Sequence, residues 1–533
     1  MYKLKPKSKK ELLKAAMGKV PADLALKNCQ MVNVFTGEIY PAVIYVKDGF
    51  IAHVEMHELD GLYHAEDVFD CEGRYLIPGF IDSHMHIESS MMVPRNMAKV
   101  IVPHGTTTIV HDPHELANVY GVEGVQYMHD SAEGLPMRQL VDIPSCVPAV
   151  PGCENAGAEF FAPEIRELER AVGLAEVMDF LGVMHGDDRM MDIIEAAEEA
   201  GLYIQGHAPC VSGRSLSAYL CGGPSTCHET TGSAEALEKL RMGMYVDASE
   251  SSIIKNVEAV WNGVKDCKFY DTLTLCTDDR ESDDLLHVGH MNAAVRKAVA
   301  CGMDPVAAIK SATINTAREI GVAHLGAIAP GYVADMVLTK DLTTLWADVV
   351  FYEGKIVAKD GKVVTPIEDI TFDLETKNSM NLSPLTEEDF VINPPVENGT
   401  VKINIMEYVA KDSGLTVKRT VELPVEDGKI VLDKDMAFMA VWNRYGKGTK
   451  SLGIVKNFGL EVGAIASTVS HDSHNLTMVY FDPKDAMVAA NELIACGGGM
   501  TAVKDGEVLN TLRLEVGGLM TKLDAEALTV EAA

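Results

Sequence analysis

The stretch Pro78-Gly-Phe-Ile-Asp-Ser-His-Met-His-Ile-Glu-Ser-Ser90 is the most informative part of this chain. An apolar run, 75–81, leads into it and predicts a buried β-strand. Residues two apart on a strand point to the same face, so His84 and His86 project side by side from the strand end and Met85 turns away. Two converging imidazoles make half of a metal site, although histidines two apart are also common on solvated strands. The choice between a metal site and a pair of solvated histidines depends on whether more ligands follow at other strand ends.

Strand-like and helix-like segments alternate from residue 79 to about residue 320. The apolar patterns predict strands at 79–84, 106–111, 142–149, 174–178, 203–207, 225–228, 244–248 and 273–277. Between them lie helical patterns, among them 189–200, 212–220, 234–241, 252–264 and 286–300. Eight strand–helix units in a segment of this size are typical of a (β/α)₈ TIM-like barrel. We therefore expect an α/β fold built on such a barrel.

The segments on either side of the barrel predict further domains. Both flanks, 19–72 and 325–361, are rich in short strands, and we expect them to pair into one small β-sandwich domain. The expected division is an N-terminal part of this domain with an N-terminal helix (1–75), the metal-dependent barrel (76–322) and the returning part (323–366). Residues 367–396 are rich in Asp, Glu, Asn and Pro and predict a linker, while 397–533 predicts a C-terminal α+β domain.

Composition limits the kinds of partner and compartment. The net charge of −32 argues against nucleic acid, because phosphate contacts need clustered Lys and Arg. No apolar run reaches the ~18 residues that a membrane-spanning helix needs, and no apolar leader region follows the basic N-terminus. The eleven cysteines are scattered and form no Cys-x-x-Cys pair, which favours reduced thiols and a cytoplasmic protein.

Ionisable residues recur where the predicted strands end. The catalytic site of a (β/α)₈ barrel lies at the C-terminal ends of its strands. Six residues gather there: His84, His86, Glu176, His207, His228 and Asp278. Four histidines and two carboxylates, with no thiolate, suit two divalent ions ~3.5–4 Å apart that share a carboxylate and a water. This ligand set favours Mn or Fe and also accepts Zn.

Each of these residues has a structural alternative. A histidine at a strand end is often simply hydrogen-bonded, and Asp278 could cap the helix that follows it. Glu176 lies among apolar residues and would be costly to bury without a partner. The six together are harder to explain this way, because all fall at the same end of one predicted barrel. The residues alone thus predict metal-dependent hydrolysis of a C–N bond.

Several motifs resemble a known family. The pattern Pro-Gly-Phe-Ile-Asp-x-His-x-His at 78–86, a His after the fifth and sixth strands and an Asp after the eighth are similar to the amidohydrolase superfamily. Most two-metal members carry a carboxylated lysine after the fourth strand, where this chain has Glu176, as the bacterial-type adenine deaminases do. The motifs that resemble this narrower family are His86-Ile-Glu-Ser-Ser-Met-Met92, Asp112-Pro-His-Glu115, Gly173-Leu-Ala-Glu176, Cys227-His-Glu229, Cys276-Thr-Asp-Asp-Arg280 and Val469-Ser-His-Asp-Ser-His-Asn475.

The resemblance implies a substrate and a mechanism. A metal-bridged hydroxide would attack C6 of adenine, a cyclic amidine, and give hypoxanthine and ammonia in purine salvage or catabolism. Asp278 would take the proton of the hydroxide and pass it to the departing amine. Glu176 would bridge the ions and carry a proton to a ring nitrogen. Adenine is thus the expected small-molecule partner, with no nucleic acid and no membrane, and we expect a homo-oligomer, a dimer.

The sequence leaves the roles of several other residues and two alternative functions undecided. Glu88 either faces the substrate as a catalytic group or serves the start of a helix. His114, His471 and His474 either make structural hydrogen bonds, or one of them helps to close the pocket or holds an extra metal. Another amidohydrolase reaction, such as cyclic amide hydrolysis or deamination of a different purine, is the nearest alternative. A non-catalytic scaffold of the same fold is a second one, and the six filled ligand positions argue against it.

Overall fold

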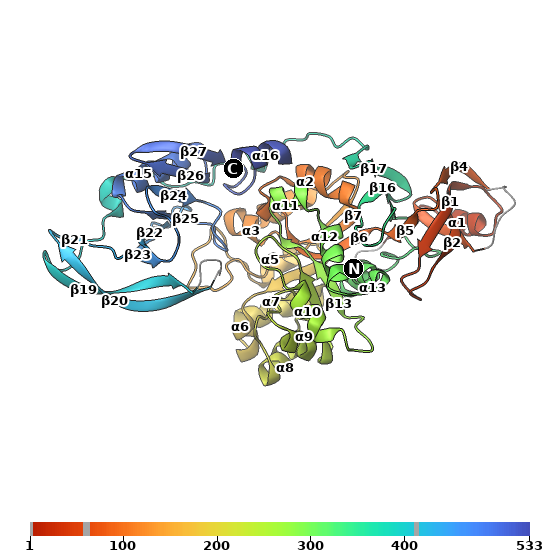
Figure 1. Ribbon diagram of the computed structural model, residues 1–533, viewed down its shortest axis with the longest axis horizontal. Helices are drawn as coiled ribbons and strands as arrows, with labels where there is room; N and C mark the ends of the chain where they lie inside the picture. The colour runs from red at the N-terminus through yellow and green to blue at the C-terminus, as the bar shows by residue number, and fades with distance from the viewer. Residues whose placement is uncertain (1–3, 57–63, 410–414, 533) are drawn as a thin grey trace.

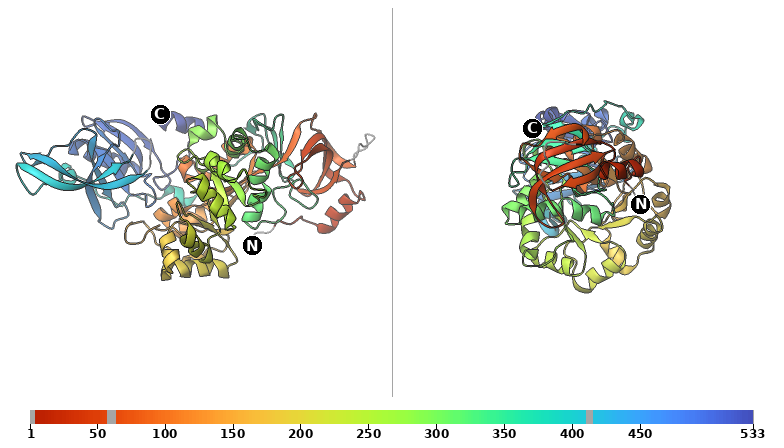
Figure 2. Two further views of the ribbon diagram at one scale, coloured as in Figure 1. Left: turned by 60° about the horizontal axis from the view of Figure 1, so that its bottom comes forward. Right: turned by 90° about the vertical axis from the view of Figure 1, so that its right-hand side faces the viewer.

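The computed structural model describes residues 4–56, 64–409 and 415–532 of the chain. A β-sheet domain, a central barrel and a second β-sheet domain follow one another along the long axis of the molecule (Figures 1 and 2). No helix in the described ranges is both long and apolar enough to cross a membrane. The barrel thus has a neighbouring domain on each side, and one of the two supplies residues to its mouth.

Within the described residues, eight parallel strands form the barrel: β6 (Phe80–His86), β7 (Thr106–His111), β8 (Arg138–Val141), β9 (Gly173–Val177), β10 (Tyr203–Gly206), β11 (Thr226–Cys227), β12 (Tyr245–Ser249) and β13 (Leu273–Cys276). A bridge between Ile143 and Leu174 joins β8 to β9, and the amide of Ser225 donates to the carbonyl of Ile204 between β10 and β11. The short strand β14 (Asp278–Asp279) follows β13 and pairs with β6, which closes the barrel. The predicted fold class is confirmed.

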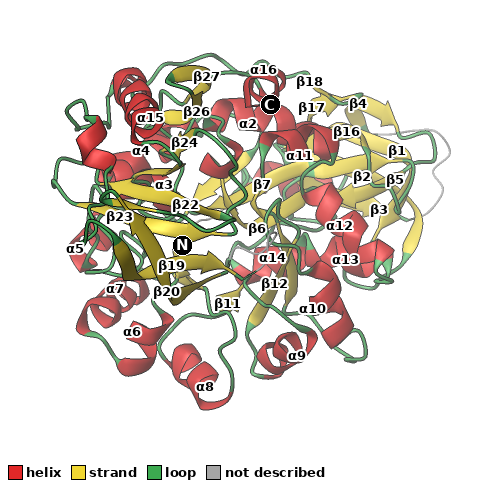
Figure 3. Ribbon diagram, turned by 60° about the vertical axis from the view of Figure 1, so that its left-hand side comes forward, coloured by secondary structure: helices red, strands yellow, loops and turns green. Residues whose placement is uncertain are grey.

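Helices cover the outside of the barrel, and Figure 3 shows α6 to α9 along one side of it. Three predicted helices agree with α7, α8 and α9 to within one residue at each end, whereas 252–264 begins only at 257. The predicted helix 286–300 is interrupted, because Gly289 has a φ of 110° and separates α11 from α12. The helices are α2 (Pro94–Ile101), α3 (His114–Tyr120), α4 (Val122–Ser131), α5 (Ala162–Glu167), α6 (Phe180–His185), α7 (Asp188–Glu199), α8 (Gly213–Cys221), α9 (Ser233–Arg241), α10 (Val257–Val264), α11 (Ser282–His287), α12 (Met291–Ala300), α13 (Pro305–Ser311) and α14 (Ile314–Glu319).

The third predicted strand was wrong. The strand is β8, which ends at Val141, and the apolar segment 142–149 that was expected to form it is mostly loop. Pro144 and Pro148 lack the backbone N–H that a central strand must donate, so the ladder cannot run through them. The polar residues at the start of β8 made this strand hard to recognise in the sequence. Arg138 is buried there because it forms an ion pair with Asp335.

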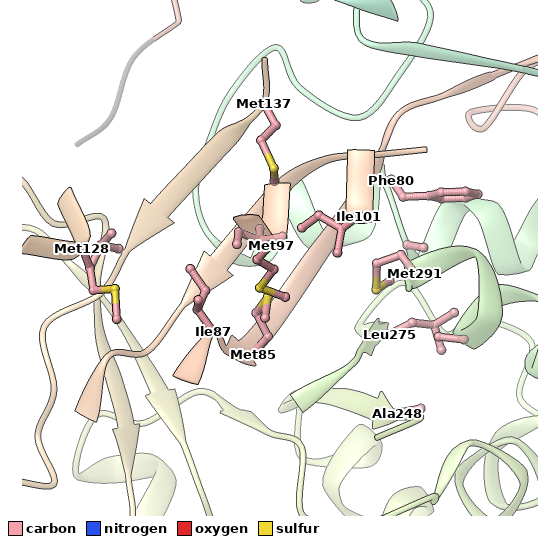
Figure 4. Close-up of a cluster of buried hydrophobic side chains, with 14 of the residues drawn as sticks. Phe80, Met85, Ile87, Met97, Ile101, Met128, Met137, Ala248, Leu275 and Met291 are labelled. Atoms are coloured by element: carbon pink, nitrogen blue, oxygen red, sulfur yellow. The ribbon is translucent and has the colours of Figure 1, made fainter. Parts of the chain in front are cut away.

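The apolar side chains that alternate with the histidines of β6 are buried in the core. Met85 is fully buried between His84 and His86 in sequence, and it lies next to Met97 of α2 in the cluster that Figure 4 shows. Because Met85 points into this cluster, the two histidines point the other way, towards the barrel mouth. The alternation expected from the sequence is confirmed for this strand.

The first β-sheet combines both flanks of the barrel, as predicted. It contains β1 (Ala22–Val32), β2 (Ile39–Lys47), β3 (Phe50–Glu55), β4 (Ala65–Asp70), β5 (Tyr75–Pro78), β15 (Met336–Thr339), β16 (Ala347–Tyr352), β17 (Lys355–Lys359) and β18 (Lys362–Val363). The two flanks meet where β5 pairs antiparallel with β15. Leu26 of β1 and Phe351 of β16 belong to one buried cluster, so the sheet curves around a core of its own. The N-terminal helix α1 (Lys9–Ala16) begins after Ser8, whose hydroxyl accepts the amide of Glu11.

The second sheet lies beyond the barrel. Its strands are β19 (Gly399–Tyr408), β20 (Thr416–Glu426), β21 (Lys429–Ile430), β22 (Met436–Trp442), β23 (Lys450–Lys456), β24 (Ala464–Ser467), β25 (Leu476–Tyr480), β26 (Gly499–Lys504) and β27 (Glu507–Arg513). Helix α15 (Pro483–Cys496) packs Ala486 and Leu493 against this sheet. Residues 367–396 contain two short 3₁₀ helices, η3 (Asp373–Thr376) and η4 (Glu387–Phe390), and Phe390 is buried against the same core.

Two segments of the C-terminal region return to the barrel. After β27 the chain runs back along α2, where the amide of Thr521 donates to the carbonyl of Met91, and it ends in α16 (Ala525–Ala532). The loop 469–475 between β24 and β25 also reaches the barrel, because Ser473 donates a hydrogen bond to Glu154. The second of these contacts brings the C-terminal domain to the catalytic end of the barrel.

Arg444 connects these segments, and we predict that Arg444→Met destabilises the protein. Its fully buried guanidinium donates to the carbonyls of His474 and Gly517 and to the hydroxyl of Ser379, over 2.6, 2.8 and 2.7 Å. Loss of the guanidinium removes these three hydrogen bonds, and each buried acceptor that is left without a donor costs about 1–3 kcal/mol. Thermal denaturation should show a clearly lower melting temperature than in Arg419→Met, which removes an exposed ion pair. Equal melting temperatures for the two variants would contradict this prediction.

Candidate metal centre

The structure brings all six predicted ligands together at the C-terminal end of the barrel. His84 and His86 end β6, and Glu176 lies near the end of β9. His207 and His228 directly follow β10 and β11, and Asp278 begins β14. Five of the six are buried, and the exception, His207, exposes 19% of its side chain. Because these strands are neighbours around one barrel, ligands that are far apart in sequence share one site.

Glu176 lies at the centre of the group. Its Oε2 is 2.6 Å from Nδ1 of His207 and 3.3 Å from Nε2 of His228. Its Oε1 is 3.5 Å from Nε2 of His86 on the other side. The two oxygens of one carboxylate thus face two different groups of histidines, which is the arrangement expected of a ligand shared by two ions.

Asp278 completes the group on the Oε1 side. Its Oδ1 is 3.5 Å from Nε2 of His86 and 3.9 Å from Nε2 of His84. These separations exceed a hydrogen bond. Two atoms that each lie about 2.0–2.2 Å from one ion are roughly 3–3.7 Å apart, so the separations suit ligands around a cation. Nε2 of His84 is buried and has no hydrogen-bond partner, which also fits a nitrogen that binds metal.

Hydrogen bonds hold the Nδ1 atoms of His84 and His86. Nδ1 of His84 lies 2.9 Å from Oε1 of Gln205, and Nδ1 of His86 lies 3.0 Å from the carbonyl oxygen of Asp112. Both partners are acceptors, so each Nδ1 carries the proton and each Nε2 presents a lone pair to the site. Hydrogen bonds of this kind fix the tautomer and the orientation of metal-binding histidines.

The two carboxylates of the site are charged in the folded protein. Burial opposes ionisation of Glu176, but the neighbouring His207 and His228 outweigh it and lower its pKa well below the usual value. Burial is likewise outweighed at Asp278, where the contact with His86 and the charge of His228 lower the pKa. At His228 the charge of Glu176 overcomes the effect of burial and raises the pKa to about 10. Both carboxylates are therefore ionised at neutral pH and attract positive charge.

Glu88 contacts α3 and the last residue of β7. Its Oε1 accepts the amide of Leu116 at 3.1 Å, at the start of α3, and its Oε2 is 3.5 Å from Nε2 of His111. Burial, reinforced by the charge of Glu115, raises the pKa of Glu88 to about 8. Of the two roles left open by the sequence, this placement favours the structural one, next to a helix start.

The remaining candidate histidines form a second layer around the mouth. Nδ1 of His114 is 3.5 Å from Oε1 of Glu176, so this residue borders the six ligands. His471 and His474 come from the loop 469–475, and their rings lie 5.1 Å apart. Nε2 of His474 is 3.5 Å from Oε2 of Glu115 in α3. The C-terminal domain thus contributes directly to the mouth of the barrel.

Three polar residues of this site were not predicted from the sequence. Gln205 of β10 precedes His207 by two residues, and this period of two was the signal that could have found it. Asp112 and Asp472 stand inside motifs that were recognised, but neither was considered as a site residue. Asp112 holds His86 through its carbonyl and His114 through its carboxylate. The role of Asp472 depends on how two distant segments pack, which no local pattern contains.

We predict that Gln205→Leu weakens metal binding about 10–100-fold, because His84 loses the acceptor that orients it. Gln205→Glu keeps an acceptor in the same place and should bind metal more tightly than the leucine variant. Competition with a chromogenic chelator measures both dissociation constants. The role assigned to Gln205 is wrong if the leucine variant binds metal as tightly as the unaltered protein.

Comparison with known proteins places the chain in a family. Residues 75–364 match the amidohydrolase family, and residues 413–533 match the adenine deaminase C-terminal domain. The adenine deaminase of Moorella thermoacetica is 40% identical over 98% of this chain and 89% of its own length. The chain belongs to the adenine deaminase family. Adenine deaminase 2 of Carboxydothermus hydrogenoformans is 40% identical over 96% of this chain and 88% of its own length, and the adenine deaminase of Kosmotoga olearia is 37% identical over 97% and 89%.

Membership in this family confirms the resemblance found in the sequence. It spans both the barrel and the C-terminal domain, because one family match covers each. The protein is a metal-dependent hydrolase of the amidohydrolase type, and buried groups of His, Asp and Glu offer ligands for divalent metal.

Proposed function

We propose that this protein deaminates adenine by hydrolysis and releases hypoxanthine and ammonia. The observation that carries the proposal is the position of Glu176, with one oxygen towards His207 and His228 and the other towards His86. The near full-length similarity to proteins named adenine deaminase supports adenine as the substrate.

We further propose that two divalent ions, Mn or Fe in preference to Zn, bind these ligands. His84, His86 and Asp278 would hold one ion with Oε1 of Glu176, while His207 and His228 would hold the other with Oε2. Divalent ions at such a site lower the pKa of water and act as Lewis acids. Nitrogen and carboxylate ligands without sulfur suit these metals.

The carboxylates of the chain handle the protons in this proposal. Deamination forms a C6–O bond with water and breaks the C6–N bond, so one proton of the water must reach the departing amine and the other must reach a ring nitrogen. Asp278 is ionised at neutral pH and therefore accepts the proton of the attacking water, which it then gives to the amine. Glu176 lies next to the same position and would carry a proton to a ring nitrogen. Ammonia then leaves and hypoxanthine remains.

We also propose that the protein is a cytoplasmic homodimer with the domain limits expected above. Supporting this location, the eleven cysteines are free thiols, as a reducing compartment would keep them. Sedimentation of the purified protein tests the dimer directly, since a monomer would sediment as a particle of half the mass.

The substrate is tested with a panel of related compounds. Mn-loaded protein is incubated with adenine, guanine, adenosine and hydantoin, and products are separated by chromatography with ultraviolet detection. The proposal expects hypoxanthine and an equal amount of ammonia from adenine alone. Hydrolysis of hydantoin, or deamination of guanine or adenosine in place of adenine, would favour another amidohydrolase reaction. No product from any of the four would favour a scaffold.

A further inference from the structure

A buried nitrogen without a partner marks a second place where the barrel meets the C-terminal domain. Nε2 of His114, in α3, is buried and makes no hydrogen bond. It faces Oδ1 of Asp472, in the loop 469–475, across 3.7 Å. A polar atom that is buried unpaired is costly, so something is expected to lie between these two groups.

The hydrogen bonds of His114 show what its Nε2 offers. Nδ1 lies 3.1 Å from Oδ2 of Asp112, whose other oxygen accepts the backbone amide of His114 at 3.0 Å. Because a carboxylate accepts, Nδ1 carries the proton and Nε2 has a lone pair. A lone pair then faces the carboxylate of Asp472, and two acceptors repel each other unless a cation or a hydrogen-bond donor lies between them. Even a protonated Nε2 would be too far away, since 3.7 Å exceeds a hydrogen bond.

His471 supplies a third ligand at the same place. Its Nδ1 is 3.8 Å from Oδ1 of Asp472, and ligand atoms of His114, His471 and Asp472 all lie within 4.8 Å of one another. Atoms at about 2.0–2.2 Å from one ion are separated by roughly 3–3.7 Å, so a small movement of these side chains would close a cation site. We propose that His114, His471 and Asp472 bind a third divalent transition-metal ion, separate from the two-ion centre.

The neighbouring histidine lacks this capacity. Nδ1 of His474 accepts the amide of Ser470 at 3.2 Å, so its Nε2 carries the proton, and this Nε2 lies 3.5 Å from Oε2 of Glu115. A nitrogen that bears a proton has no lone pair for a metal. His474 therefore stays outside the third site, although it lies next to His471, and it provides a matched control.

The third site is open to solvent on its outer side. The side chains of His471 and Asp472 are 37% and 25% exposed, and both line a cavity of about 640 Å³ together with Glu154 and Lys450. Two histidines and one carboxylate leave several coordination positions to water. An ion held there would join α3 of the barrel to a loop of the C-terminal domain. The C-terminal domain would then hold the mouth of the barrel in place in a metal-dependent way.

Equilibrium dialysis against Mn²⁺, followed by elemental analysis, tests this site. The intact protein should bind three ions per chain at saturation, and His471→Ala and Asp472→Asn should each bind one fewer. His474→Gln should bind as many as the intact protein. The proposal is overturned if His471→Ala and Asp472→Asn keep the full number, or if His474→Gln loses an ion as they do.

Amide hydrogen exchange gives a second readout that does not depend on turnover. In the intact protein, Mn²⁺ should slow exchange in residues 469–475 about tenfold or more, and this effect should disappear in His471→Ala. Equal exchange with and without Mn²⁺ in the intact protein would count against the third ion. The two-ion centre is tested apart from this one by His228→Ala, which should lose adenine turnover but keep the effect of Mn²⁺ on the loop.

Discussion

Asp278→Asn is expected to lower adenine turnover by about 10²–10⁴-fold, the usual contribution of general acid–base catalysis. Asparagine has nearly the same shape as aspartate and still offers an oxygen to a metal, but it cannot accept and release the proton that the reaction moves. The carboxylate of Asp278 is ionised in the folded protein because its contact with His86 and the charge of His228 outweigh burial. The effect should therefore appear in kcat at saturating adenine.

Asp247→Asn is the matched control for this prediction. Asp247 is equally buried in the barrel, but its Oδ1 accepts the hydroxyls of Ser83 and Thr274. Its amide oxygen can accept the same hydrogen bonds, so turnover should stay close to that of the unaltered protein. Near-normal turnover of Asp278→Asn, with its metal content intact, would remove Asp278 from proton transfer.

Glu176→Gln is the second change with a large expected effect. An amide presents one oxygen and one NH₂ group, so it cannot serve an ion on each side as the carboxylate does. Metal affinity should fall by more than about 100-fold, since that is the upper range for residues that only support a ligand. At least one ion per chain should be lost after desalting, and adenine turnover should fall with it.

Glu319→Gln separates this effect from the general cost of changing a buried glutamate. Burial and the nearby Asp247 raise the pKa of Glu319 well above its usual value, so its carboxyl is neutral and resembles an amide. Its metal content and turnover should match those of the unaltered protein. If Glu176→Gln also keeps both ions, Glu176 is not a shared ligand.

The alternation of side chains on single strands made much of the site predictable. His84 and His86 could be placed on one face, and Met85 in the core, because strand geometry has a period of two. The position of ligands at strand ends then followed from the barrel. The misplaced third strand shows the limit, because Arg138 reads as a surface residue until its buried partner Asp335 is known.

Contacts between distant segments could not be predicted in this way. The sequence left Glu88 between two roles, and only its hydrogen bond from Leu116 favours one of them. Asp472 is a polar loop residue in sequence, yet the packing of the C-terminal domain brings it to His114. Such pairs depend on how whole domains dock, and no local period or motif spacing records that.

The central claim is that a two-ion centre in the barrel hydrolyses adenine, and titration of metal-free protein with Mn²⁺ tests it most directly. Adenine loss is followed by ultraviolet absorbance while bound ions are counted. Turnover should be absent without metal, rise as ions bind and reach its plateau only when the two barrel positions are filled. The variant His228→Ala should gain no turnover when Mn²⁺ is added. Full turnover in metal-free protein, or none with both positions filled, would contradict the claim.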